Sequence, residues 1–120
     1  MNNHRIMVID DENIVGKMLR AILEQDGYMV ELFLSASPAL TRLKEERFDV
    51  VITDLKMKGL DGLEILHTVK EEYPQTKVIM ITAYANLNIA MDALREKADD
   101  FFPKPVRIKD IKSSIERLLK

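Results

Sequence analysis

The chain has 120 residues and a formal net charge of −2, and its mixture of 47% hydrophobic and 32% charged residues is that of an ordinary single globular domain. It contains no cysteine, which excludes disulfides, zinc–thiolate sites and thiol catalysis. The charge gives no global attraction to nucleic acid, and neither a basic stripe nor a DNA-reading helix is present. No apolar run is long enough to span a membrane, and residues 1–5 lack the core of a signal peptide. We therefore expect a cytoplasmic domain without a membrane partner.

The first elements alternate in type. Residues 5–9 form an apolar run that predicts a strand, and this strand runs directly into Asp10 and Asp11. From Asn13 onward, apolar residues recur at helical spacing until Gly27, which is a typical helix stop. Residues 28–33 then alternate apolar and charged side chains, as an edge strand does.

The middle of the chain repeats this alternation. A weaker helix is expected over about 37–46, followed by an apolar strand at 49–53 that ends at Asp54. The loop 55–61 follows, and the next helix ends before Pro74.

The last third predicts one more strand at 77–81, ending at Thr82, and a helix near 87–96. A short strand at 100–103 precedes Lys104, and a final amphipathic helix begins near Ile108. Strands that alternate with helices indicate crossover units, and therefore a parallel sheet with helices on both faces.

Polar residues stand where the predicted strands end. Because strand ends of one sense lie on one edge of a parallel sheet, these residues are expected to converge there. They are Asp10, Asp11, Asp54, Thr82 and Lys104. Three carboxylates and an amine in one place are costly unless they bind something, most simply a divalent metal ion and an anion. Singly, each has a plainer interpretation: the aspartates as a helix cap or turn residue, and Lys104 as a solvated side chain.

Five segments together resemble the receiver domain of two-component response regulators, over essentially the whole chain. They are Val8-Ile9-Asp10-Asp11-Glu12, Ile52-Thr53-Asp54-Leu55-Lys56-Met57, Asp61-Gly62, Ile81-Thr82-Ala83-Tyr84 and Asp100-Phe101-Phe102-Pro103-Lys104-Pro105. The resemblance implies one receiver domain spanning residues 1–120. It also implies a flavodoxin-like α/β fold, with a five-stranded parallel sheet in the order 2-1-3-4-5 and helices on both faces.

The resemblance also implies a division of labour in the site. Asp54 is the expected phosphoryl acceptor, since an ionised carboxylate can attack phosphorus. The expected cofactor is Mg²⁺, held directly by Asp11, Asp54 and the backbone carbonyl of Lys56, with Asp10 acting mainly through water. Lys104 is expected to neutralise charge on the phosphoryl oxygens.

Thr82 and Phe101 match the family's switch pair. The Thr82 hydroxyl would turn toward the new phosphoryl group and the aromatic ring would fill the vacated space, a packing change driven by roughly −1.5 to −2 units of added charge. The resemblance also implies a cis peptide bond between Lys104 and Pro105.

Several positions depart from the common family pattern. Lys58 stands where proline is frequent, and Lys97 stands where glycine is frequent, so Lys97 is expected either to end its helix differently or to take a left-handed conformation. The side chains of Lys56 and Tyr84 are expected at the mouth of the pocket, where the family tunes hydrolysis of the phosphoaspartate. We hypothesise that Lys56 slows dephosphorylation, so that an unchanged phosphoaspartate lifetime in Lys56→Asn would contradict this role.

The implied partners are a sensor histidine kinase or phosphotransfer protein, and an output domain or target protein, with a weak resemblance to ATPase-coupled transcription regulators at residues 82–84. A phosphorylation-dependent dimer is a further expectation. Asp99 and Asp100 match the dimer contacts of the winged-helix subclass, but Ser114 replaces the usual arginine, which argues against that particular arrangement.

Three alternatives remain. A phosphatase of the haloacid dehalogenase type uses an aspartate nucleophile, but it wants a second aspartate where Lys56 stands. A flavodoxin-like cofactor binder wants a phosphate-cradling loop where Asp10, Asp11 and Glu12 would repel a phosphate. A degenerate receiver would be an interaction module without phosphorylation. Under the leading interpretation the domain is no enzyme toward an external substrate and catalyses only its own phosphorylation and dephosphorylation.

Overall fold

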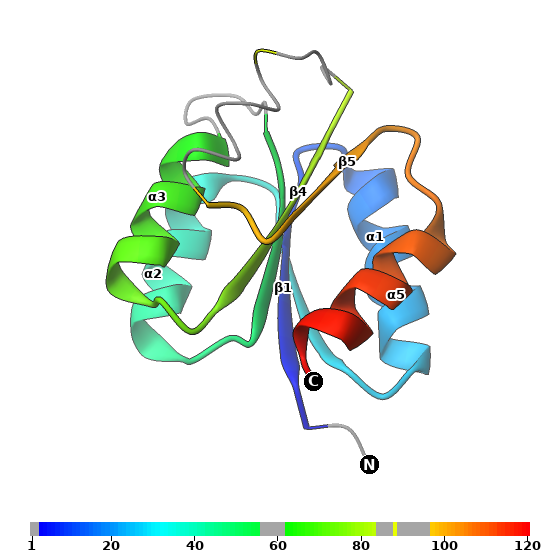
Figure 1. Ribbon diagram of the computed structural model, residues 1–120, viewed down its shortest axis with the longest axis horizontal. Coiled ribbons are helices and arrows are strands. Elements are labelled where there is room, and N and C mark those ends of the chain that lie inside the picture. Colours follow the sequence, from blue (N-terminus) through cyan, green and yellow to red (C-terminus); the bar gives the residue numbers. More distant parts are fainter. Residues whose placement is uncertain (1–2, 56–61, 84–87, 89–96) are drawn as a thin grey trace.

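The computed structural model describes residues 3–55, 62–83, 88 and 97–120, which form a three-layer α/β domain (Figure 1). Its strands are β1 (Arg5–Ile9), β2 (Met29–Phe33), β3 (Val50–Asp54), β4 (Lys77–Thr82) and β5 (Asp100–Pro103). Its helices are α1 (Asn13–Gln25), α2 (Ala36–Glu45), α3 (Gly62–Glu72) and α5 (Ile108–Leu118). The helix predicted near 87–96 and the residues Lys56, Lys58, Asp61 and Tyr84 lie outside the described residues.

The five strands form one parallel sheet in the order β2-β1-β3-β4-β5, which confirms the predicted flavodoxin-like topology. The alternating run at 29–33 is an edge strand, as predicted. The central strands β3 and β4 are almost wholly buried, which explains their continuous runs of apolar residues.

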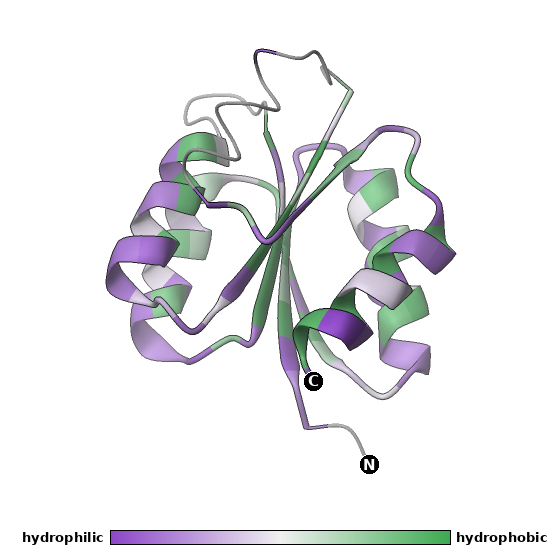
Figure 2. Cartoon of the chain, in the orientation of Figure 1, coloured by the Kyte–Doolittle hydropathy of each residue, from purple (hydrophilic) through white to green (hydrophobic). Residues whose placement is uncertain are grey.

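Successive side chains along each strand point to opposite faces, and each face has its own core. On one face, Met7, Val51 and Met80 pack with the buried sides of α2 and α3. On the other, Val8 and Ile52 pack with α1 and α5. Figures 1 and 2 show these two helix pairs on either side of the sheet, with hydrophobic residues concentrated in its strands. This double coverage leaves the two ends of the strands as the places where polar groups can gather.

Two backbone conformations match expectations from the sequence. Lys97, where the family commonly has glycine, takes a positive φ of 67°, which is the left-handed conformation considered for it. The peptide bond between Lys104 and Pro105 is cis. Gly27, which follows α1, has a φ of 93°, a conformation that favours glycine and explains why it stops the helix.

Candidate phosphoacceptor and metal site

The strand ends do converge. Asp10 follows β1, Asp54 is the last residue of β3, and Lys104 follows β5. The backbone N–H of Lys104 donates a 2.7 Å hydrogen bond to the carbonyl oxygen of Thr82, so the end of β4 is joined to the same place. Asp10 and Thr82 are completely buried and Asp54 is only 4% exposed. Four of the five residues predicted from the sequence therefore line one small region at the carboxyl edge of the sheet.

Lys104 is the centre of this region. Its Nζ lies 2.8 Å from Asp54 Oδ2, 2.8 Å from Glu12 Oε1 and 3.1 Å from Asp10 Oδ2. The side chains of Lys104, Asp10 and Asp54 are 10%, 0% and 6% exposed, so the contacts of the lysine with these two aspartates are largely shielded from water, whereas Glu12 is exposed. Burial lowers the pKa of Lys104, but the three carboxylates outweigh it and raise that pKa overall. The amine is therefore firmly charged.

The carboxylates outnumber the positive charge. Burial raises the pKa of Asp10, more than the backbone N–H of Glu12 and the amine of Lys104 lower it, and Asp54 raises it further. Asp10 Oδ1 accepts that N–H at 2.8 Å, whereas Oδ2, although close to Lys104, receives no hydrogen bond from the part of the chain that the structure describes. A buried carboxylate oxygen without a donor fits a cation.

The donor set fits a hard divalent cation. Carboxylate oxygens of Asp10, Glu12 and Asp54 lie within 4.8 Å of one another, and oxygen ligands of this kind suit Mg²⁺. No metal ion is present in the structure. Glu12 is a candidate ligand that the sequence interpretation missed, although its place after Asp10 and Asp11 was a usable signal. Asp11 is exposed and stays a predicted ligand, as does the backbone carbonyl of Lys56, which lies outside the described residues together with Tyr84.

The predicted switch residues occupy the neighbouring elements. Thr82 closes β4, and Phe101 lies in β5 opposite Met80. The Phe101 ring is half-buried and packs against the core formed with α2 and α3. The switch itself stays a prediction, because a packing change needs two states.

The plainer interpretation of Asp10 as a helix cap is partly realised, since its carboxylate accepts the N–H of Glu12 at the start of α1. The cap position itself is Glu12, which makes no side-chain capping bond.

The aspartates beside β5 are engaged within the chain. Asp100 Oδ2 lies 2.6 Å from both Ser114 Oγ and Arg117 Nη2, and Asp99 Oδ2 lies 2.5 Å from Lys70 Nζ. Both carboxylates considered for a winged-helix type dimer therefore already have basic or hydroxyl partners in their own domain.

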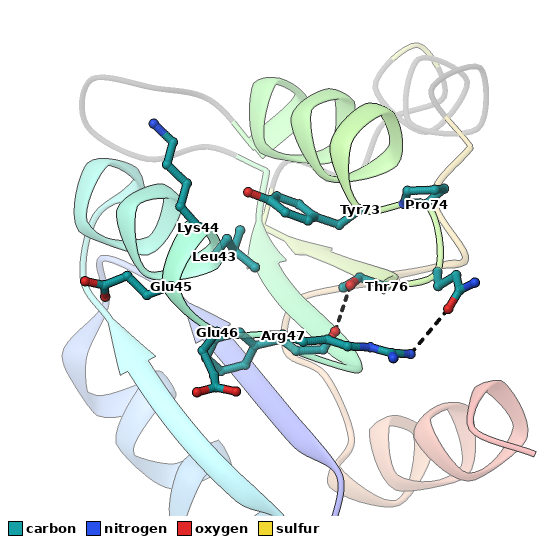
Figure 3. A pocket seen from close by; sticks show the side chains of 10 residues that line it. Leu43, Lys44, Glu45, Glu46, Arg47, Tyr73, Pro74 and Thr76 are labelled. Atoms are coloured by element: carbon teal, nitrogen blue, oxygen red, sulfur yellow. Dashed lines mark hydrogen bonds between the residues drawn. The ribbon is translucent and has the colours of Figure 1, made fainter.

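A pocket of about 490 Å³ lies at the opposite edge of the sheet, between the segments that lead into β3 and β4 (Figure 3). Phe48, Tyr73 and Thr76 are among its lining residues, and it contains none of the clustered carboxylates. It is therefore separate from the candidate site.

A sheet of this order, with carboxylates and a lysine at the topological switch point, defines a flavodoxin-like α/β domain with an acidic cluster that fits a divalent cation. A family model described as the response regulator receiver domain matches residues 6–116. The chain therefore belongs to the family of response regulator receiver domains. Such domains are generally signalling domains rather than enzymes acting on an external substrate.

The relatives agree with this assignment. The chain is 33% identical to the DNA-binding transcriptional regulator NtrC of Proteus hauseri, over 99% of this chain and 25% of that protein. The chain spans about a quarter of the length of the curated relatives it matches.

Two solved structures are close in shape. A CheY-like response regulator receiver domain protein from Methanospirillum hungatei JF-1 superimposes with a TM-score of 0.92 at 32% identity, covering 98% of this chain and 94% of that one. The beryllofluoride-activated receiver domain dimer of NtrC4 has a TM-score of 0.90 at 31% identity, covering 95% of this chain and 94% of that one.

None of the helices in the described ranges combines the length and the apolar character that crossing a bilayer requires.

Proposed function

We propose that this domain is a phosphorylation-dependent switch in which Asp54 accepts a phosphoryl group. The observation that carries the proposal is the contact of 2.8 Å between Lys104 Nζ and Asp54 Oδ2, inside a cluster that holds two further carboxylates. The amine of Lys104 is thus close enough to contact the oxygens of a phosphoryl group attached to Asp54. The membership of the chain in the receiver family supports the same role.

The step is an attack of one Asp54 carboxylate oxygen on phosphorus. An oxygen–phosphorus bond forms, the bond from phosphorus to the donor's imidazole nitrogen breaks, and that nitrogen keeps the electron pair. Lys104 is close enough to follow the transferred oxygens, which would draw its amine away from Asp54 and Glu12. The donor is expected to be the phosphohistidine of a sensor kinase or of a phosphotransfer protein.

The cofactor that we assign is Mg²⁺, held by Asp10, Asp11 or Glu12, Asp54 and the carbonyl of Lys56. When bound, it would supply the positive charge that lets carboxylate and phosphoryl oxygens approach one another. Among the described residues, one lysine ammonium group contacts the three clustered carboxylates, so a bound cation would lower their mutual repulsion.

The output belongs to the proposal as well. Thr82 and Phe101 would report phosphorylation, and the changed surface around β5 and α5 would control an output domain or a target protein. The relative NtrC is named as a DNA-binding transcriptional regulator, which favours transcription as the process controlled. Direct nucleic-acid binding by this domain is not part of the proposal, and a cytoplasmic location stays a prediction.

The test is acetyl phosphate with Mg²⁺, followed by the intact mass of the protein. Wild type is expected to gain one phosphate, Asp54→Asn none, and Asp26→Asn, which changes an exposed carboxylate after α1, as much as wild type. Absence of an adduct in wild type would indicate a degenerate receiver. Turnover of a small phosphomonoester would instead favour the phosphatase alternative. The lifetime of the adduct in wild type and Lys56→Asn tests the proposed autodephosphorylation and the tuning role predicted for Lys56 and Tyr84.

A phosphorylation-dependent dimer is a second element of the proposal, supported by the beryllofluoride-activated dimer of the NtrC4 receiver domain. The internal partners of Asp99 and Asp100 argue for a contact other than the winged-helix type. Light scattering with and without beryllofluoride measures it, and a mass that stays monomeric in both states would remove the dimer from the proposal.

A further inference from the structure

The backbone that carries the acceptor is held from three sides. The N–H of Leu55 donates to the Ile81 carbonyl on β4 at 3.0 Å, and the Leu55 carbonyl accepts the N–H of Gly62 at 2.7 Å. The carbonyl of Asp54 accepts the buried hydroxyl of Thr53 at 3.1 Å. The Asp54–Leu55 peptide is therefore clamped between its own strand, the neighbouring strand and the start of α3.

Gly62 approaches this peptide more closely than any other residue type would allow. It is buried, and a Cβ at this position would lie 2.8 Å from Leu55 Cα and 3.1 Å from the carbonyl carbon of Asp54, and closer still to the Asp54 oxygen. All three are backbone atoms, which cannot rotate away as a side chain does. A side chain at position 62 would therefore have to displace either α3 or the acceptor.

We propose that Gly62 and Thr53 are positioning residues for Asp54, an inference that rests on the proposed phosphoacceptor function. Neither touches the transferred group. Gly62 lets the first turn of α3 close on the acceptor's own peptide, and Thr53 fixes the orientation of the Asp54 carbonyl. Together they set where the carboxylate stands relative to Lys104, 2.8 Å away.

The phosphorylation rate is expected to depend strongly on the position of the Asp54 carboxylate. In-line attack on phosphorus needs the acceptor oxygen, the phosphorus and the leaving nitrogen aligned, and a misplacement of about 1 Å costs about a hundredfold in rate. Asp10 and Glu12 are carried by β1 and the start of α1. A shift of the Asp54 peptide would therefore move the acceptor while leaving those two carboxylates in place.

The first test compares Gly62→Ala with Gly27→Ala. Both changes add one methyl group. Gly27 follows the C-terminus of α1, away from Asp54, and a side chain there meets no close atoms and is disfavoured only by the positive φ. Under conditions where urea titration shows both variants folded, the phosphorylation rate at saturating Mg²⁺ is expected to fall about 10- to 100-fold in Gly62→Ala and less than about twofold in Gly27→Ala.

A second pair covers the case in which Gly62→Ala does not fold. Thr53→Val removes the hydroxyl that Asp54 accepts, and Thr76→Val removes an equally buried hydroxyl that donates at 2.7 Å to Phe48 at the opposite edge of the sheet. The shapes of the side chains are conserved. Phosphorylation is expected to slow about 3- to 10-fold in Thr53→Val alone, well inside the hundredfold range that misplacement spans.

A purely structural role would not produce a difference between the effect on the phosphorylation rate and the effect on Mg²⁺ affinity, so the two quantities are measured together. The phosphorylation rate at saturating Mg²⁺ is expected to fall in Gly62→Ala and Thr53→Val by a larger factor than the Mg²⁺ dissociation constant rises, because Asp54 moves with its peptide whereas the proposed ligands Asp10 and Glu12 stay in place. Equal losses in the control variants, or wild-type rates in both test variants, would overturn the inference. An absence of phosphorylation in wild type would instead overturn the proposed function.

Discussion

Two half-buried lysines, Lys70 and Lys104, lie near opposite ends of the strands of the sheet and differ in their contacts. Lys70, on α3, contacts one carboxylate, Asp99, and donates to the carbonyl of Thr76 at 3.0 Å, while Asp99 also accepts the N–H of Val78 at 2.7 Å. Lys104 contacts three carboxylates at once. Their side chains are 18% and 10% exposed, so burial does not distinguish them.

The balance of charge does distinguish them. Where β4 and β5 begin, the ammonium group of Lys70 pairs with the carboxylate of Asp99. Each group also makes one hydrogen bond to the backbone. At the carboxyl edge, the described residues place one ammonium group among three carboxylates, and the Asp10 Oδ2 atom has no hydrogen-bond donor among those residues. The paired charges of Lys70 and Asp99 stabilise the fold, whereas the carboxylates around Lys104 fit the binding of a cation.

The largest expected effect comes from replacing each lysine with methionine. Lys104→Met should lower the phosphorylation rate about 10²- to 10³-fold, because a cation aimed at the transferred oxygens is lost. Lys70→Met should leave that rate unchanged and lower the free energy of unfolding by about 1–3 kcal/mol, a range reduced from that of fully buried pairs because both side chains are partly exposed. Phosphorylation assays and urea titrations measure the two effects.

Mg²⁺ separates the same two variants further. It should stabilise Lys104→Met more than wild type, since the metal replaces the missing counter-charge, and should stabilise Lys70→Met only as much as wild type. Equal Mg²⁺ stabilisation in both variants would contradict the contrast between the two edges.

The next effect is a change in the free energy of unfolding that has opposite signs when Asp99 and Asp10 are replaced with asparagine. Asp99→Asn should destabilise the domain by about 2 kcal/mol, because an ionised acceptor of two hydrogen bonds is lost. Asp10→Asn should stabilise it at pH 7 in a chelating buffer. Asp10 has a raised pKa, so the folded state binds more protons than the unfolded state above pH 3.8, and the free energy of unfolding falls as pH rises from 3.8 through the raised pKa.

Asp10→Asn should remove this decline, and its urea midpoint should therefore depend less on pH than that of wild type. The comparison is made by urea titration from acidic to neutral pH with EDTA present. A steeper decline in the variant would contradict the charge excess proposed for the carboxyl edge.

A smaller effect is expected at Glu12. Glu12→Gln should raise the Mg²⁺ dissociation constant about 3- to 10-fold, since one carboxylate of the cluster is neutralised. The effect is limited because the Glu12 side chain is 58% exposed. Glu24→Gln, which changes an exposed glutamate paired with Arg20 on the same helix, is the matched control for calorimetric titration. An unchanged constant in Glu12→Gln would leave Asp11 as the ligand from this segment.

The smallest effect is expected beside β5, where Asp100 is balanced by two partners. Arg117→Ala should cost less than about 0.5 kcal/mol, because the arginine side chain is 61% exposed. Ser114→Ala should cost about 1 kcal/mol, since its hydroxyl is buried and donates at 2.6 Å to the carboxylate. Urea titration measures both, and the reverse order would show that the exposed ion pair holds α5.

Much of this architecture is readable from the sequence because its signals are local. The strand at 77–81 is marked by a continuous apolar run and the helix from Asn13 by apolar periodicity, and the order of the sheet follows once the receiver motifs are recognised. The left-handed Lys97 and the cis bond before Pro105 are likewise properties of single positions in a family pattern.

What the sequence could not supply are relations between distant atoms. That Glu12 joins Asp10 and Asp54 depends on how α1 leaves β1, and that Ser114 and Arg117 share Asp100 depends on how α5 lies against β5. The contact of Gly62 with the Asp54–Leu55 peptide depends on the packing of α3. Periodicity predicts each of these helices but not the side chains that meet across them.

The sheet order has a consequence for biosynthesis. Asp10 follows β1 and Asp54 ends the adjacent strand β3, whereas Lys104, which contacts both carboxylates, follows β5, the last strand of the sheet in sequence order. As the chain leaves the ribosome, a sheet of β1 to β4 would bring the carboxylates together before Lys104 emerges. Until Lys104 has been translated, the two carboxylates therefore lack the amine that contacts both of them in the finished domain.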